Sequence, residues 1–256
     1  MSLVSIFTPG RPAFIPYVMA GDPDLETTRL ILAALARANA GAIELGIPYG
    51  DPLADGATIA AAGTRALANG TRIADVLALV KLARDAGGPP IVLFTYFNPI
   101  YRYGLEAFAL DAAAAGAAGA LVPDIALEES DELRATLAKH GLEMPLMVAP
   151  STPRDRAAII AAASGGFVYV VSRLGVTGAG AAPDFSPLHG QVAMLREVTD
   201  KPLAVGFGVS TPAHVAQVAP LVDGIIVGSA LIDAYAGTSG REAAAAVERF
   251  VGTLFG

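Results

Sequence analysis

Cysteine and tryptophan are absent from the 256 residues, and histidine occurs only three times. Without cysteine the chain can form no disulfide, no thiolate metal site and no cysteine nucleophile. His140, His189 and His214 are scattered along the chain and fit no ligand-spaced motif, so we expect no metal site. Any chemistry must therefore come from carboxylate, hydroxyl, tyrosine, lysine or arginine side chains.

Charge is also scarce. Charged residues make up 16% of the chain, the net charge is −7, and lysine and arginine form no run. The 54% hydrophobic composition argues against disorder, and the lack of a basic patch argues against nucleic-acid binding.

The longest charge-free stretch, residues 202–222, is interrupted by prolines and makes a poor membrane span. The N-terminus lacks the pattern of a signal peptide, so we expect a cytoplasmic protein.

Short apolar runs alternate with alanine-rich amphipathic stretches along the chain. Continuous apolar runs bounded by Gly, Pro or Asp are typical of buried strands, and apolar residues at helical spacing indicate helices. The predicted strands are Phe14–Met19, Ala42–Leu45, Ile91–Tyr96, Ala120–Val122, Pro145–Val148, Phe167–Val171, Leu203–Val205 and Gly224–Val227. The predicted helices are Leu25–Ala38, Ile73–Ala86, Leu105–Ala115, Leu127–Lys139, Arg154–Ala163, Pro187–Val198, Pro212–Ala219 and Arg241–Leu254.

Eight strand–helix units of about 32 residues each favour a single (β/α)8 barrel, a TIM barrel. A doubly wound sheet would usually have fewer strands and a switch point. No linker or shift in composition divides the chain, so we assign residues 1–256 to one domain. The stretch Ile59–Asn69 predicts an extra helix after the second strand.

Two carboxylates follow the second predicted strand. Glu44 lies inside an apolar run, where an unpaired carboxylate is costly and has a raised pKa suited to proton transfer. A structural glutamate bonded to loop amides is an equally good interpretation of Glu44. Asp55 follows in a loop that Pro48 and Pro52 stiffen, and two neighbouring carboxylates can divide the roles of proton donor and acceptor. Asp51 in the same loop is better explained by turn chemistry.

The last third of the chain is rich in glycine at predicted strand ends, at residues 175–180, 206–208 and 228. Glycines let backbone N–H groups approach an anion, and the loops after the seventh and eighth strands are the usual phosphate site of a barrel. Residues 175–182 contain little except Gly and Ala, which fits either a lid that closes over substrate or a merely disordered surface loop. These residues point to a barrel enzyme acting on a small phosphorylated substrate.

The run ELGIPYGDPLADG, at residues 44–56, resembles the signature of the tryptophan synthase alpha-subunit family. The resemblance continues with GDP at 21–23, PDIALEES at 123–130, APSTP at 149–153, YVVSRLGVTGA at 169–179, GFGVS at 206–210 and VGSALI at 227–232. It implies a (β/α)8 barrel that cleaves indole-3-glycerol phosphate to indole and glyceraldehyde 3-phosphate in tryptophan biosynthesis. It also implies a retro-aldol reaction without Schiff base or metal.

The resemblance assigns roles residue by residue. Glu44 matches the family's catalytic glutamate, which protonates indole C3, and Asp55 matches the aspartate that stabilises charge at the indole nitrogen. The remaining matches are Gly178, Gly208, Gly228 and Ser229 at the phosphate, Tyr96, Tyr169 and Phe207 in the indole pocket, Thr177 in the lid, and Pro48 and Asp51 at the beta-subunit interface. These matches imply an α2β2 complex in which pyridoxal phosphate belongs to the beta subunit and this chain binds none.

The chain departs from the family pattern at Gly50, Ala57 and Ala126, where Ser, Pro and Pro are usual. These changes affect the expected beta-contact surface or its support more than the chemistry. A stand-alone indole-3-glycerol-phosphate lyase would share every motif and is the main alternative. Phosphate-binding barrel isomerases would lack the motif at residues 44–56, and a silent activator of the beta subunit would not need Glu44 and Asp55.

Overall fold

Eight parallel strands form the centre of the computed structural model, which describes residues 2–172, 185–206 and 208–256. The strands lie in the order β4-β3-β2-β1-β8-β7-β6-β5. A parallel bridge joins Gly119 of β4 to Glu143, in the segment before β5, where the Ala120 N–H donates to the Glu143 carbonyl at 2.9 Å, so that the sheet forms a nearly closed barrel. The bounds are β1 Ala13–Met19, β2 Ile43–Gly46, β3 Ile91–Phe94, β4 Gly119–Leu121, β5 Leu146–Val148, β6 Val168–Val171, β7 Leu203–Gly206 and β8 Gly224–Val227.

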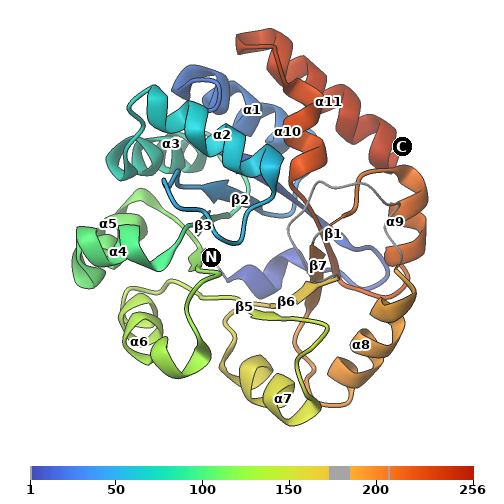
Figure 1. The fold of residues 1–256 in the computed structure, drawn as a ribbon. Helices are drawn as coiled ribbons and strands as arrows, with labels where there is room; N and C mark the ends of the chain where they lie inside the picture. The colour runs from blue at the N-terminus through green and yellow to red at the C-terminus, as the bar shows by residue number, and fades with distance from the viewer. Residues whose placement is uncertain (1, 173–184, 207) are drawn as a thin grey trace.

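Helices surround the strands, as Figure 1 shows. They bury an apolar face against the outside of the barrel, so that nearly every strand residue is inaccessible to solvent. The bounds are α1 Leu25–Arg37, α2 Ala57–Ala68, α3 Ile73–Asp85, α4 Phe97–Tyr103, α5 Leu105–Ala115, α6 Asp131–Lys139, α7 Arg154–Ala163, α8 Ser186–Arg196, α9 Pro212–Val218, α10 Ser229–Tyr235 and α11 Gly240–Phe255. None of these helices is long and apolar enough to cross a membrane.

The predicted barrel and its extra helix are confirmed: α2 occupies the place expected after the second strand. Two details of the prediction are wrong. The single helix expected at Leu127–Lys139 is a 3-10 turn, η2 (Leu127–Glu129), followed by α6, because the Ser130 hydroxyl between them donates to the Leu127 carbonyl at 2.7 Å. The third strand ends at Phe94, and Tyr96 instead precedes α4, a helix that the sequence did not predict.

The N-terminal segment covers the end of the barrel where the strands begin. A short 3-10 helix, η1 (Leu3–Ile6), places Leu3 fully inside the core. The Glu143 carboxylate accepts from the Ser2 hydroxyl and from the Leu3 N–H, both at 2.8 Å. Phe7 packs edge-on against Phe167 with ring centres 5.7 Å apart. A substrate would therefore enter from the opposite end, where the strands terminate.

Candidate active site

Glu44 is a buried acid in the middle of β2. Its side chain is 1% exposed, and Oε1 has no hydrogen-bond partner among the described residues. Burial raises the pKa of Glu44 to about 8, because a carboxylate loses its hydration inside the barrel. Glu44 is therefore mostly protonated at neutral pH and holds a proton that it can donate.

Two tyrosines share the interior with Glu44. Tyr17 on β1 is in register with Glu44, while Tyr169 lies on β6, four strands away along the sheet order. Burial raises the pKa of both phenols, and the Glu44 carboxylate adds to the rise in each. The Tyr17 hydroxyl lies where a Cβ on Gly46 would project, and Glu44 and Gly46 share one face of β2, so Glu44 and Tyr17 lie on the same face of the sheet.

Asp55 belongs to the loop that joins β2 to α2. Burial raises the pKa of Asp55 to about 6, and a hydrogen bond from the Tyr96 hydroxyl opposes the rise. The same hydroxyl accepts from the Ala54 N–H at 3.0 Å. Tyr96 thus holds the Asp55 loop, and its place in an indole pocket stays a prediction. At neutral pH Asp55 is mostly ionised while Glu44 is mostly neutral, a separation typical of acid–base pairs in enzymes.

Tyr169 and Tyr17 each lie over a strand-end glycine. A Cβ built at Gly206 would come within 2.0 Å of the Tyr169 hydroxyl, and one at Gly46 within 2.3 Å of the Tyr17 hydroxyl. Neither position can therefore carry a side chain unless the tyrosine moves. Sequence reasoning missed Tyr17 because it reads as an ordinary core residue, although its strand position relative to Glu44 would have placed the two side by side.

The substitution Gly206→Ala is expected to displace Tyr169 and damage the site. The added methyl overlaps a rigid aromatic ring, so we expect a loss of about 1–3 kcal/mol in unfolding free energy. We also expect kcat/KM for the reaction proposed below to fall by about tenfold or more. Gly190→Ala is the matched control, since a Cβ at that position in α8 meets nothing within 4 Å. Equal behaviour of the two variants in unfolding and kinetics would contradict the packing argument.

The candidate phosphate residues come from the ends of β7 and β8. Gly208 follows β7 with a φ of +107°, a conformation that favours glycine. Gly228 follows β8 and precedes Ser229, the first residue of α10. These residues lie at the same end of the barrel as the Asp55 loop, because all eight strands run parallel. Gly178, Thr177 and Phe207 lie outside the described residues.

The loop of residues 47–56 also holds the positions matched to the partner interface. Pro48 is buried within the chain, whereas Asp51 is exposed. Leu53, which the sequence did not single out, is 76% exposed. Tyr49 packs against Tyr96 with the rings tilted by 36° and their centres 5.4 Å apart. The loop therefore presents an apolar side chain outward while its inner face holds Asp55, and its role at an interface stays a prediction.

Comparisons with known proteins identify the family of the chain. The sequence model of the family described as "Tryptophan synthase alpha chain" matches residues 4–254. The tryptophan synthase alpha chain of Picosynechococcus sp. is 48% identical over 96% of this chain and 93% of its own. That of Chloroflexus aggregans is 48% identical over 88% and 84%, respectively.

Solved structures agree in fold. A structure of Mycobacterium tuberculosis tryptophan synthase is similar with a TM-score of 0.86 and 39% identity, covering 96% of this chain and 94% of that one. The tryptophan synthase complex of Pyrococcus furiosus has a TM-score of 0.86 and 37% identity, with coverage of 95% and 98%. By its sequence along almost its whole length and by its fold, the chain belongs to the tryptophan synthase alpha chain family.

Proposed function

We propose that the chain cleaves indole-3-glycerol phosphate to indole and glyceraldehyde 3-phosphate, with Glu44 as the acid and Asp55 as the charge-stabilising group. The observation that carries the proposal is the placement of a fully buried acid, Glu44 on β2, below a second acid, Asp55, in the loop that follows the same strand. Burial raises the pKa of Glu44 to about 8 and that of Asp55 to about 6, which favours a neutral Glu44 beside an ionised Asp55. Membership of the alpha chain family supplies the substrate.

The reaction needs a neutral Glu44 and an ionised Asp55. Glu44 donates its proton to indole C3, which makes that carbon tetrahedral and leaves positive charge on the ring near the nitrogen. The ionised Asp55 stabilises that charge through the indole N–H. The bond from C3 to the glycerol carbon then breaks, its electron pair returns to the ring, and the glycerol hydroxyl becomes an aldehyde. The Glu44 carboxylate accepts the hydroxyl proton and is ready for the next cycle.

The three lysines lie away from this site, which favours acid–base chemistry over a Schiff base. Lys81 on α3 pairs with Asp85 at 2.6 Å, and Lys139 on α6 pairs with Glu106 at 2.6 Å. Lys201, which precedes β7, donates to the Ala162 carbonyl at 2.8 Å. A pyridoxal phosphate aldimine also requires a lysine. We accordingly place that cofactor in the beta-subunit partner and none in this chain.

The phosphate would bind between the ends of β7 and β8. We assign Gly208, Gly228 and Ser229 to it, with Gly178 from outside the described residues, because glycines admit close approach of an anion to backbone N–H groups. Tyr96, Tyr169 and Phe207 would line the indole pocket, and Thr177 would belong to the lid.

The partner is a tryptophan synthase beta subunit, and we propose an α2β2 assembly. The relatives are named as alpha chains of tryptophan synthase, and one similar structure is that of a tryptophan synthase complex, which favours a subunit over a stand-alone lyase. We assign the contact to the exposed Asp51 and to Pro48 of the same loop. A phosphorylated substrate does not cross membranes freely, and we therefore place the protein in the cytoplasm.

The test is indole release from indole-3-glycerol phosphate by the purified chain, with and without a tryptophan synthase beta subunit. We expect slow release alone and strong activation by the beta subunit. Fast release that the beta subunit leaves unchanged would identify a stand-alone lyase. No release under either condition would overturn the proposed reaction.

A further inference from the structure

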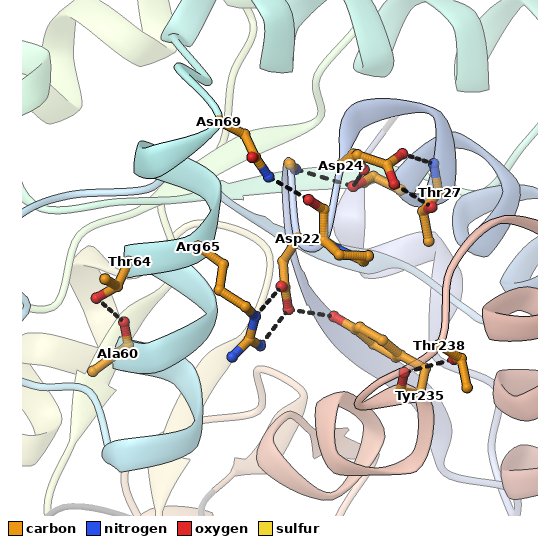
Figure 2. A network of polar contacts seen from close by, with 12 residues as sticks. Asp22, Asp24, Thr27, Ala60, Thr64, Arg65, Asn69, Tyr235 and Thr238 are labelled. Atoms are coloured by element: carbon orange, nitrogen blue, oxygen red, sulfur yellow. Dashed lines mark hydrogen bonds and ion pairs between the residues drawn. The ribbon is translucent and has the colours of Figure 1, made fainter.

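Three side chains from separate elements meet at one face of α2, and Figure 2 shows them as one network. Asp22 lies in the turn after β1, Arg65 in α2 and Tyr235 at the end of α10. Arg65 binds both carboxylate oxygens, with Nε 2.6 Å from Oδ1 and Nη2 2.9 Å from Oδ2. The Tyr235 hydroxyl donates to Oδ2 at 3.4 Å. We refer to Asp22, Arg65 and Tyr235 as the clamp.

Burial makes the clamp sensitive to the loss of any member. Asp22 is 1% exposed and Tyr235 is 2% exposed, whereas the side chain of Arg65 is 47% exposed. A buried carboxylate without its cation is strongly destabilised, whereas the two-pronged contact of an arginine satisfies both oxygens in fixed geometry. The clamp therefore fixes the relative positions of the three elements that it joins.

The helix α2 is held by limited apolar packing, in which the partly buried Ile59 takes part, and by polar contacts. Within its length, all of which the structure describes, the buried residues are Ala62, Gly63 and Ala66. These small groups supply little apolar area, and no side chain caps the helix at Gly56. Polar contacts add to this packing in holding α2. Besides the clamp, the Thr58 hydroxyl donates to Asp233 of α10 at 3.2 Å.

The turn after β1 also contacts the C-terminal end of α2. The Asn69 amide donates to the Pro23 carbonyl, as Figure 2 also shows. A Cβ at Gly21 would come within 2.0 Å of the Thr71 hydroxyl, so that turn and the residues after α2 are in direct contact. Polar contacts near its C-terminal end, together with that of Thr58 near its start, therefore hold α2 against the barrel.

The N-terminal end of α2 carries the catalytic loop. Asp55 immediately precedes Gly56, whose carbonyl accepts the first helical bond, from the Ala60 N–H at 2.9 Å. We propose that Arg65, through its ion pair with Asp22, is a positioning residue that fixes α2 and thereby aims the Asp55 carboxylate at the substrate. This inference rests on the proposed function and assigns to that reaction a residue that does not touch the substrate.

The test compares kcat and KM for indole release in Arg65→Met and Arg29→Met variants. Arg29 is the matched control, because it also makes a two-pronged ion pair, with Glu26 at 2.6 and 2.7 Å, on the surface helix α1. For Arg65→Met we expect kcat to fall about tenfold with KM within about twofold, since a small displacement of a catalytic group costs rate more than binding. Arg65→Lys, which restores the charge but not the two-pronged contact, should recover part of the loss.

A second variant separates the positioning of Asp55 from the stability of the fold. In Asp22→Asn/Arg65→Met no charge is left buried, so folding is better preserved than in the single variant while the clamp is still broken. We expect its kcat to show the same tenfold loss. Wild-type kcat in a folded Arg65→Met or double variant, or an equal loss in Arg29→Met, would overturn the inference. Lack of cleavage by the wild-type chain would instead overturn the proposed function.

Discussion

Replacing Glu44 with glutamine is expected to abolish indole release, by about 10³-fold or more, while leaving the fold intact. Glutamine matches the size of the protonated acid but cannot donate a proton to C3, and general acids of this kind contribute about 10²–10⁴-fold. Steady-state indole release measures the loss, and circular dichroism together with activation of the beta subunit measures what remains. Glu129→Gln, an exposed change in η2, is the control. Cleavage by Glu44→Gln at near the wild-type rate would remove Glu44 from the mechanism.

The same variant tests the protonation state of Glu44 through stability. Its pKa is raised from 4.5 to about 8 on folding, so the contribution of the neutral acid is complete below about pH 4.5 and is lost as the pH rises through 8. At about 1.4 kcal/mol per pKa unit this amounts to several kcal/mol. We expect Glu44→Gln to gain stability relative to wild type between pH 5 and pH 9 in urea titrations. A constant difference would show that Glu44 ionises normally.

Replacing Asp55 with asparagine is expected to lower kcat by about 10²–10³-fold, the usual cost of losing one group that stabilises transition-state charge. The amide keeps the size of the side chain and its contact with the Tyr96 hydroxyl but carries no charge to balance the ring. Because the site is only partly closed to water around Asp55, the loss should be smaller than that of Glu44→Gln.

Asp51→Asn is the matched control for Asp55, four residues earlier in the same loop and exposed. It should leave indole release by the isolated chain unchanged and weaken only the activation by the beta subunit. If Asp51→Asn and Asp55→Asn lowered the isolated rate equally, the loop as a whole, rather than the Asp55 carboxylate, would be responsible.

The barrel could be predicted because each buried strand has its own apolar run between turn residues. The helix α4 was missed because Phe97–Tyr103 contains Pro99 and three aromatic residues in seven, a composition without helical periodicity. Its end depends on Gly104, whose φ of +95° separates α4 from α5. The break at Ser130 was missed for a similar reason, since one side-chain hydrogen bond decides it against a continuous helical pattern.

The two carboxylates were found from sequence because their signals are local: an acid inside a buried strand, and a second acid in a loop stiffened by prolines. The clamp gives no such signal. Asp22, Arg65 and Tyr235 are far apart in the chain, and only the closure of the barrel brings α10 next to β1 and α2. The second function of Tyr96, as a support for the Asp55 loop, likewise depends on a contact across 42 residues.

The pH dependence of kcat/KM for indole release by the wild-type chain tests the division of charge between Glu44 and Asp55 most directly. This ratio reports the ionisation of the free enzyme. We expect it to rise through about pH 6, as Asp55 ionises, and to fall through about pH 8, as Glu44 loses its proton. The alkaline limb is decisive, because the substrate phosphate also titrates near pH 6. A rate that stays constant from pH 7 to well above pH 9 would contradict the account.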